Sequence, residues 1–426
     1  MEKRQTLGTM VIRVCGLIFG ALATAMLARL LQPEKFGEYS FVLAVMTILS
    51  MPLAFGLRQT LMREIAYARA HADTGRNLQI WAWAVNRAIW ATAVFAVILA
   101  AWVAWGINDA DLQWQMALGV GIYLFLPTPK LLSGVLHGMG HTVQSQFPEF
   151  VLRPFLTIVI LSGVWIAGDP PSLSVSVALL IFALTLLADA ALSVMLLKRG
   201  SDFRFWPQKQ SHPKTTQGWA LTISTLSFGA IASVQLINNN LDIVMLGLLS
   251  TDAQVGLYKA ATVLSTIAVF GLGAVNTVIM PQVAKLHAEG NSEHLQEMIT
   301  KAARIITAFG IGGAVITWVF GKFLLTLIFD SSYEGAFSAL VILTVGQFAN
   351  ACFGPVALIL NMTGHQKLTL IGVTTAVLVN GALNLALVPH YGMEGAAIAT
   401  AVSLVLWNAL LAIALKRRTG YSSSIL

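Results

Sequence analysis

A few charged residues interrupt the long apolar runs of this chain, and they are the first candidates for chemistry. Three of them are basic, Arg13, Lys130 and Arg153, and one, Asp189, is acidic. A charged side chain at the centre of a membrane helix costs about 2.5–3.5 kcal/mol on insertion scales, so it usually faces a partner or a water-filled cavity. Because the cations outnumber the acid, we expect a cavity that binds an anionic ligand. Snorkelling to the membrane surface and structural ion pairs are the alternatives.

The neighbours of these residues indicate which way they face. Arg13 precedes Gly16 and Gly20 in a ladder of small residues at four-residue spacing, and such ladders usually face other helices rather than lipid. Lys130 follows two prolines, and Arg153 precedes a third. Proline opens a helix, which is tolerated at membrane depth mainly beside protein or a water-filled cavity. We therefore expect one cluster in the cytoplasmic half of the first set of helices, with the acid as a partial counter-ion.

A second polar set lies in the C-terminal half of the chain. Gln235, Asn238 and Asp242 recur at steps of three and four residues, which places them on one face of a helix. This stripe predicts either a hydrated cavity or hydrogen bonds between helices. Asp242 is expected either to bind a coupling ion, H⁺ or Na⁺, or to pair with Lys259.

Patterns of catalysis and of metal binding are absent from the sequence. No phosphate-binding GxxxxGK[ST] loop and no HExxH motif occurs. Cys15 and Cys352 both fall in apolar runs and form neither a CxxC pattern nor a disulfide framework. Asn380 and Asn384 are interpreted as a structural polar pair. We expect no enzyme activity, no bound metal and no cofactor other than the coupling ion.

The elements that must position these residues are predicted from the composition. Of the 426 residues, 57% are apolar and 11% are charged, against about 25% charged in a soluble globular domain. A membrane helix needs about 20 residues, and the long runs do not alternate as barrel strands do. We therefore expect an all-α polytopic membrane protein with about twelve transmembrane helices. The predicted spans are residues 7–31, 39–57, 87–105, 115–138, 150–167, 173–197, 219–249, 255–281, 303–329, 333–362, 368–387 and 392–415.

The basic residues between the spans predict the orientation. They gather in alternate connections and at both ends of the chain, whereas the other set of connections holds only Lys35. Because cytoplasmic loops carry an excess of Lys and Arg, both termini are predicted to be cytoplasmic. The formal net charge of +7 is therefore ascribed to membrane topology, and no nucleic-acid partner is expected.

Two short matches suggest that the chain contains a repeat. Gly37 and Tyr39 match Gly256 and Tyr258 at an offset of 219 residues, and Gly140-His141 matches Gly364-His365 at an offset of 224. The predicted domains are a six-helix lobe at 1–197, a cytoplasmic linker at 198–218 and a second six-helix lobe at 219–426. Because six is even, the lobes are expected to be parallel repeats, which typically bind substrate between them and alternate access by rocking.

Longer pieces around these matches resemble a known family. They are Phe36-Gly37-Glu38-Tyr39-Ser40, Val255-Gly256-Leu257-Tyr258-Lys259-Ala260-Ala261, and Tyr391-Gly392 followed by Gly395-Ala396-Ala397. The chain resembles the polysaccharide transporter family, the Wzx-type flippases of lipid-linked oligosaccharides, which share a superfamily with multidrug and toxin extrusion (MATE) transporters and lipid II flippases. The resemblance covers nearly the whole chain.

The resemblance implies a function as well as a fold. It implies movement of undecaprenyl-pyrophosphate-linked repeat units to the outer leaflet of the bacterial inner membrane, for O-antigen, capsule or exopolysaccharide synthesis. Membrane lipids, the polysaccharide polymerase and the chain-length machinery are the implied partners. A pyrophosphate would then be the anion expected at Arg13, Lys130, Arg153 and Asp189.

Two rival functions come from other classes. A cation-coupled MATE-type exporter of small molecules is expected to favour acids in its cavity, and the excess of cations in these spans argues against it. A membrane-embedded glycan polymerase or ligase would need a substantial external loop. The longest external loop that we predict, residues 106–114, is too short for that role.

Overall fold

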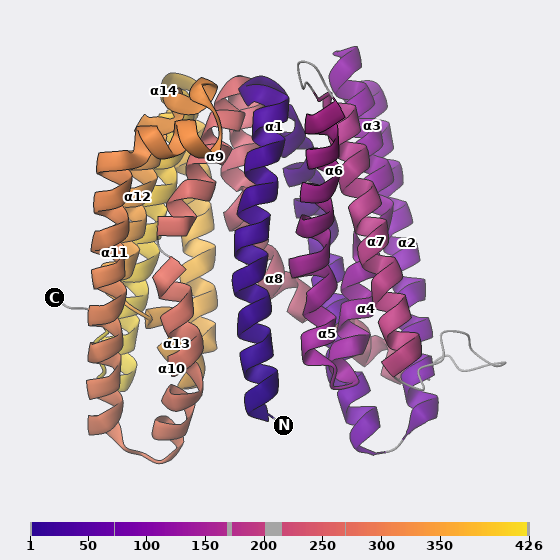
Figure 1. Ribbon diagram of the computed structural model, residues 1–426. Coiled ribbons are helices and arrows are strands. Elements are labelled where there is room, and N and C mark those ends of the chain that lie inside the picture. The colour runs from indigo at the N-terminus through magenta and orange to yellow at the C-terminus, as the bar shows by residue number, and fades with distance from the viewer. Residues whose placement is uncertain (1, 72, 168–172, 201–214, 269, 424–426) are drawn as a thin grey trace. The chain divides into compact units, whose positions relative to one another are not determined.

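The computed structural model describes residues 2–71, 73–167, 173–200, 215–268 and 270–423. These ranges fold into helices and contain no strand, as Figure 1 shows. The predicted all-α class is therefore confirmed. A helix pairs its backbone polar groups within its own segment, which is the requirement that lipid places on a spanning element.

The helices of the N-terminal part are as follows. They are α1 (Glu2–Ala70), α2 (Thr74–Gly106), α3 (Ala110–Phe125), α4 (Pro127–Gly138), α5 (Thr142–Phe147), the π-helix η1 (Pro148–Leu152), α6 (Arg153–Ala167) and α7 (Val175–Gly200).

The C-terminal part continues with eight further elements. They are α8 (Thr215–Leu249), α9 (Asp252–Ala268), α10 (Phe270–Ala288), α11 (Ser292–Ile328), the 3₁₀-helix η2 (Ser331–Ala336), α12 (Phe337–Phe353), α13 (Val356–Met362) and α14 (Gln366–Thr419).

Polar residues with side-chain oxygens fix where several helices begin. Asp73 accepts a hydrogen bond from the backbone N–H of Arg76 at the start of α2, and Asp109 accepts two at the start of α3. Asn291 does the same at the start of α11. Each cap pairs a backbone donor that the helix leaves unsatisfied, which contributes about 1 kcal/mol. These caps fix the first residues of α2, α3 and α11 within polar connections.

Eight helical segments of the described residues are long and apolar enough to cross a membrane, and a ninth counts if the bent α8 is one span. Two of the eight lie in α1 and α14, which each contain two predicted spans. A residue with non-helical dihedral angles lies where those spans meet, Gln32 between the two spans of α1 and Gly392 at the start of the second span of α14. The chain is a multi-pass membrane protein, and the total of twelve spans stays a prediction.

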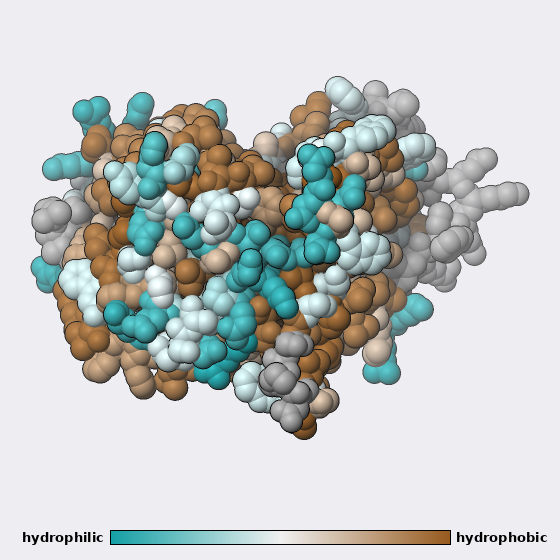
Figure 2. All heavy atoms as spheres, turned by 90° about the horizontal axis from the view of Figure 1, so that it is seen from above, coloured by the Kyte–Doolittle hydropathy of each residue, from teal (hydrophilic) through white to brown (hydrophobic). Residues whose placement is uncertain are grey.

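The surface of the helices agrees with a lipid environment. Large apolar side chains are widely exposed along the spans, among them Trp90 at 66%, Trp105 at 86% and Ile166 at 84%. Figure 2 looks onto one end of the helices and shows hydrophilic residues gathered on that end, with hydrophobic residues around the rim. Exposed apolar area of this extent is rare in soluble monomers and is typical of a surface that meets a membrane.

The chain divides into two compact units, but the border differs from the predicted one. Unit 1 comprises residues 1–31 and 42–236, and unit 2 comprises 32–41 and 237–426. The sequence placed the border in the linker at 198–218, of which 201–214 lie outside the described residues.

The border falls inside α8 because the first half of that helix packs on unit 1. Thr225 of α8 shares a buried 2.8 Å hydrogen bond with Thr60 of α1. Gly56 lets the two helices approach, since a Cβ atom there would lie 2.3 Å from the carbonyl oxygen of Thr225. A linker that merely joins two lobes at their sequence boundary would not produce these contacts.

Residues 32–41 belong to unit 2 because of another close approach. A Cβ atom on Gly37 would lie 1.8 Å from the carbonyl oxygen of Asp252, and one on Gly256 would lie 2.0 Å from that of Pro33. Neither position has room for a side chain. The two repeat motifs thus pack against each other through their glycines, inside one unit.

The other repeat match also has a structural counterpart. His141 donates its backbone N–H to Leu136 across 2.9 Å, and His365 donates to Leu360 across 2.8 Å. Gly140 and Gly364, which precede the two histidines, have φ angles of 88° and 83°, a conformation that glycine adopts without steric cost. Identical helix endings at matched positions are what a duplication predicts.

Candidate functional sites

The segment that positions the first site is the π-helix η1 between α5 and α6. Single π turns often occur at functional sites, and this one places Glu149 within it and Arg153 immediately after it. Helix α1 packs closely on the segment, because a Cβ atom on Gly16 would lie 2.8 Å from the Cβ and the carbonyl oxygen of Phe150. The ladder of small residues in α1 therefore faces protein at this point, as its spacing predicts.

Lys130 has a partner that the sequence analysis did not name. It lies in the first turn of α4 and forms an ion pair with Glu149. The ammonium group also lies 4.9 Å from the ring centroid of Phe55. Only 10% of the lysine side chain and 25% of the glutamate side chain are exposed, so the ion pair is largely shielded from solvent.

The two arginines of the predicted cluster are held in different ways. Arg13 is exposed and donates from Nε to Oε1 of Gln146 across 3.3 Å. Arg153 places its guanidinium 4.1 Å from the ring centroid of Phe182, a cation–π contact. Gln146 and the ring of Phe182 are neutral, so these contacts position the two guanidinium groups without compensating their positive charges.

Asp189 is the most deeply buried member, with 2% of its surface exposed. Its Oδ1 accepts a 3.4 Å hydrogen bond from Ser193, and its Oδ2 is buried without a partner among the described residues. Arg153 and Lys130 both act on this carboxylate electrostatically. The structure thus brings the predicted residues into one region of unit 1.

The charges of this region do not cancel. Two carboxylates, Glu149 and Asp189, stand against three cations, Arg13, Lys130 and Arg153. Arg58 is a fourth cation that acts electrostatically on Glu149, although its place at the cytoplasmic end of a predicted span gave no reason to single it out. The surplus positive charge suits an anionic ligand.

A second site lies in unit 2, around Asp242 of α8. This carboxylate accepts hydrogen bonds from Asn384 (2.8 Å), Tyr258 (3.0 Å) and Thr400 (2.7 Å), contributed by α14 and α9. Asp242 itself is 6% exposed. The sequence analysis named Asp242 here and missed the part of Tyr258 and Thr400. Tyr258 stood out only through the repeat and family motif, and Thr400 is a hydroxyl residue in an apolar run with no further signal.

The asparagine pair also belongs to this site. Asn384 donates to Oδ1 of Asn380 across 3.0 Å as well as to Asp242, and its own Oδ1 is buried without a partner among the residues that the structure describes. Their interpretation as a purely structural pair is therefore incomplete. Carboxylate, amide and hydroxyl oxygens converge here, and oxygen ligands are those that hard cations take.

In the part of the chain that the structure describes, Gln235, Asn238 and Lys259 form no hydrogen bond or ion pair with the carboxylate of Asp242. Asn238 is half-buried in α8, and Gln235 lies in the same helix with a side chain outside the described residues. Asp242 and Lys259 form no ion pair in the described part of the chain. Lys259 follows Tyr258, and consecutive side chains on a helix point about 100° apart, so Lys259 faces elsewhere when Tyr258 faces Asp242.

The fold defines the class of protein. A MATE-family multidrug transporter of the MOP superfamily, in its inward-facing conformation, matches with a TM-score of 0.74 and 14% identity, over 97% of this chain and 99% of that one. The lipid II flippase MurJ, in an inward closed conformation, matches with a TM-score of 0.73 and 12% identity, over 97% and 87%. The chain therefore has the fold of these MOP-superfamily transporters.

Within that class the family is defined by sequence. Residues 3–287, about two thirds of the chain, match the family described as polysaccharide biosynthesis protein, and the chain belongs to it. A probable low-salt glycan biosynthesis flippase of Haloferax volcanii, Agl15, is 24% identical over 163 residues, which are 38% of this chain and 34% of that protein. The chain thus matches about a third of the length of this curated relative. The predicted family resemblance is confirmed.

Proposed function

We propose that the protein is a flippase that moves undecaprenyl-pyrophosphate-linked oligosaccharide units from the inner to the outer leaflet of the bacterial cytoplasmic membrane. The products would serve O-antigen, capsule or exopolysaccharide synthesis, with the polymerase and chain-length machinery as partners and both termini in the cytoplasm. Family membership and the transporter fold support this function. The single observation that carries it is the surplus of positive charge in the region of unit 1 around η1, where Arg13, Lys130 and Arg153 stand against Glu149 and Asp189.

The pyrophosphate is the part of such a substrate that the membrane opposes most. A charge without a partner is strongly disfavoured in the hydrocarbon core, and fixed cations can replace the water and counter-ions that the group loses. Arg13 and Arg153 suit this task, because a guanidinium stays charged and binds phosphate through two parallel hydrogen bonds. Lys130 is already paired with Glu149, so we assign it the lesser share of the contact.

The acids of the cluster have a role in release. Binding that fully neutralised a pyrophosphate would hold the substrate too tightly for delivery to the other leaflet. Glu149 and Asp189 reduce the positive charge of the region, which limits the affinity. In alternating access, the surplus cations would then be open to the substrate from the cytoplasmic leaflet in one state and would release it toward the outer leaflet in the other.

The test is glycan export in cells that lack their native flippase. Arg13→Ala and Arg153→Ala are each expected to reduce export at least tenfold at unchanged protein level. Arg13→Lys should keep partial activity, because it retains the charge and loses the planar fork. Arg87→Gln removes an exposed cation of α2 that lies outside the cluster, and it should export normally. Normal export by the combined Arg13, Lys130 and Arg153 alanine variant would show that these cations are structural.

We also propose that unit 2 holds the coupling cation, Na⁺ or H⁺, at Asp242. Two groups favour Na⁺ there: the carboxylate of Asp242 and the buried Oδ1 of Asn384, which has no partner in the described part of the chain. Asn380 and Thr400 supply further oxygens. A proton on the carboxylate would satisfy Asp242 but would leave the amide oxygen of Asn384 unpaired.

The rival function is a MATE-type exporter of cationic small molecules, and one measurement separates it from the flippase. Native mass spectrometry of gently purified protein is expected to detect a prenyl-pyrophosphate glycan that the protein retains. A retained cationic small molecule, with no lipid-linked glycan on wild-type protein expressed in glycan-producing cells, would favour the exporter. The cationic surplus of unit 1 is the observation that favours the flippase.

A further inference from the structure

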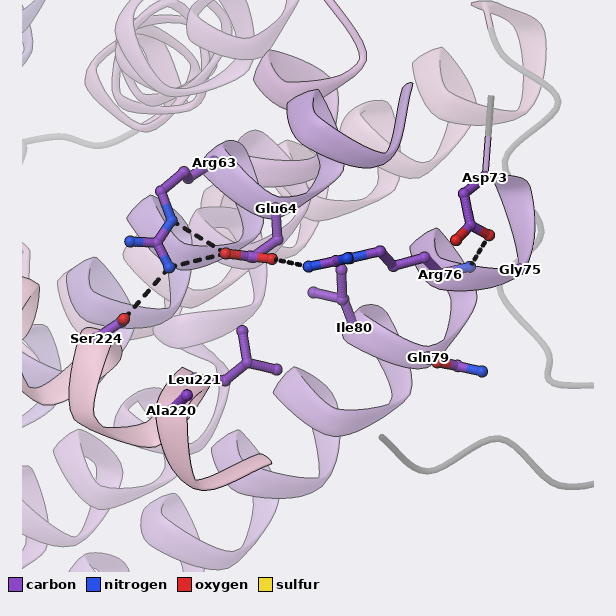
Figure 3. A pocket seen from close by; sticks show the side chains of 10 residues that line it. All are labelled: Arg63, Glu64, Asp73, Gly75, Arg76, Gln79, Ile80, Ala220, Leu221 and Ser224. Carbon is purple, nitrogen blue, oxygen red and sulfur yellow. Dashed lines mark hydrogen bonds and ion pairs between the residues drawn. The ribbon is translucent and has the colours of Figure 1, made fainter. Parts of the chain in front are cut away.

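Unit 1 has a polar cavity that belongs to neither candidate site. It has a volume of about 320 Å³ and lies where the C-terminal third of α1, the first turns of α2 and the first turns of α8 meet (Figure 3). By the positive-inside pattern this is the cytoplasmic end of unit 1. Its principal lining residues are Arg63, Glu64, Asp73, Arg76, Ile80, Leu221 and Ser224.

One carboxylate holds two guanidinium groups at this cavity. Oε1 of Glu64 accepts from Arg63, and Oε2 accepts from Arg76, each across 2.8 Å. The glutamate side chain is 11% exposed, whereas the arginine side chains are 49% and 37% exposed. The three charges sum to one surplus positive charge. The carboxylate also fixes both guanidinium groups in advance, which lowers the entropy cost of binding a ligand.

Donors remain on both arginines after these contacts. A guanidinium carries five N–H groups, and Nη1 of Arg63 and of Arg76 makes no hydrogen bond to the residues that the structure describes. The other acid of the cavity, Asp73, uses Oδ1 to cap α2 through the backbone N–H of Arg76. Figure 3 shows Asp73 at the far side of Arg76 from Glu64 and Arg63. The paired cations, rather than the acids, are therefore the groups available to a ligand.

The surroundings are those of the membrane interface. The guanidinium of Arg76 lies 4.8 Å from the ring centroid of Tyr67, which is 51% exposed. Trp219, which precedes the lining residue Ala220 in the chain, is 69% exposed. Tyrosine and tryptophan are enriched at the level of the lipid headgroups. Ile80 and Leu221 supply an apolar side to the same cavity, so the lining fits an amphiphile better than a free anion.

We propose that this cavity binds the phosphate group of a membrane lipid from the cytoplasmic leaflet. Arg63 and Arg76 would hold the phosphate oxygens through charge-assisted hydrogen bonds, and the first part of the acyl or prenyl chain would lie against the apolar wall to which the largely buried Ile80 and Leu221 belong. Ser224 already bonds Arg63 across 3.3 Å, so the bound phosphate strengthens the packing of α8 on α1 and α2. The proposal is independent of the proposed flippase activity.

The test measures lipid binding to the delipidated full-length protein in detergent by native mass spectrometry. The probes are phosphatidylglycerol, phosphatidylethanolamine, polyprenyl pyrophosphate and, as a phosphate-free lipid, diacylglycerol. The double variant Arg63→Gln/Arg76→Gln is expected to bind the phosphate-bearing probe at least tenfold more weakly than wild type. Polyprenyl pyrophosphate is compared in a background with alanine at Arg13, Lys130 and Arg153, so that the other candidate site does not contribute. Its matched control, Arg87→Gln/Lys198→Gln, removes two exposed cations outside the cavity and should bind as wild type does.

Each result either supports or overturns the proposal. If the double variant loses phosphatidylglycerol or phosphatidylethanolamine, the occupant is bulk lipid, and if it loses polyprenyl pyrophosphate alone, the occupant is a substrate-type lipid. Unchanged binding in the double variant, or equal binding of diacylglycerol, refutes a phosphate site. The triple variant Arg63→Gln/Glu64→Gln/Arg76→Gln leaves no unpaired charge and guards against misfolding. It should elute as wild type does in size exclusion and still lose the lipid.

Discussion

Asn384 donates its side-chain amide to Asp242 across 2.8 Å and leaves its own carbonyl oxygen buried without a partner among the described residues. The orientation of the amide follows from the charge of the aspartate. Turning the amide around would place its oxygen against a carboxylate oxygen, which is repulsive while Asp242 is ionised. A buried acceptor without a partner costs about 1–3 kcal/mol, and a small cation between the two side chains would remove that cost.

The first prediction concerns this cation. NaCl is expected to raise the melting temperature of the purified protein relative to choline chloride at equal ionic strength, because a ligand that binds only the folded state stabilises it by RT ln(1 + [L]/Kd). At 100 times Kd this is about 2.7 kcal/mol. Asp242→Asn should lose the Na⁺-specific shift, and Asp111→Asn, an exposed acid of α3, should keep it.

The same variants separate Na⁺ from H⁺ as the coupling ion. If export depends on a pH gradient and the Na⁺-specific shift is absent from the wild-type protein, the proton is the ion. Lys259→Gln should not restore activity to Asp242→Asn, because the two side chains form no ion pair in the part of the chain that the structure describes. Full export activity of Asp242→Asn would dismiss ion coupling at this residue altogether.

The second prediction concerns the ion pair of Lys130 and Glu149. Lys130→Met or Glu149→Gln alone should each lower the unfolding free energy by about 2–3 kcal/mol, somewhat below the 3–5 kcal/mol of fully buried pairs, since a quarter of Glu149 is exposed. Combining them should recover much of the loss, because neither charge is then left unpaired. Unfolding in mixed micelles followed by circular dichroism measures the cycle, and strictly additive losses would contradict it.

The sequence predicted the membrane class, and it singled out the residues around which both candidate sites are proposed, for simple physical reasons. Charges in apolar runs are costly, so Arg13, Arg153 and Asp242 stand out without any structure. Glu149 did not stand out, because it lies one residue before the predicted span at 150–167. The π-helix that turns it toward Lys130 depends on tertiary packing, which no periodicity reveals.

The border between the units shows a second limit of sequence reasoning. The linker at 198–218 is polar and rich in charge, a composition that predicts a border between two membrane lobes. What decides the border is instead the close approach of Gly56 to Thr225, which binds the first half of α8 to unit 1. The sequence does not distinguish a glycine that packs against a neighbouring backbone from one that faces lipid.

The third prediction distinguishes these two kinds of glycine. Gly37→Ala should destabilise the protein, because its new Cβ atom would lie 1.8 Å from the carbonyl oxygen of Asp252 and that backbone must move. Gly20→Ala is the matched control, since no heavy atom of the described residues outside the adjoining part of its own helix lies within 4 Å of its Cβ position. In a helix this change should be neutral or stabilising by up to about 1 kcal/mol. Thermal unfolding of both variants checks the pair, and equal melting temperatures would show that the contact at Gly37 yields at no cost.

The last prediction concerns topology and uses single cysteines in a background where Cys15 and Cys352 are replaced by alanine. Cysteines at Asn108 and Ser332 are expected to react with an impermeant thiol reagent in whole cells, and those at Ala70 and Ala288 are not. All four positions are exposed, so packing does not decide the outcome.

The choice of positions follows from the helix ends. Asn108 is preferred to the adjacent Asp109, because Asp109 caps α3 through two hydrogen bonds and its loss would cost about 1 kcal/mol. Permeabilised cells should label all four cysteines, which confirms that each thiol is reactive. Labelling of Ala70→Cys and Ala288→Cys but not of the other two in intact cells would invert the orientation. The cavity at Arg63 and Arg76 would then face the outer leaflet. That result would contradict the excess of basic residues, which predicts that this cavity lies at the cytoplasmic leaflet.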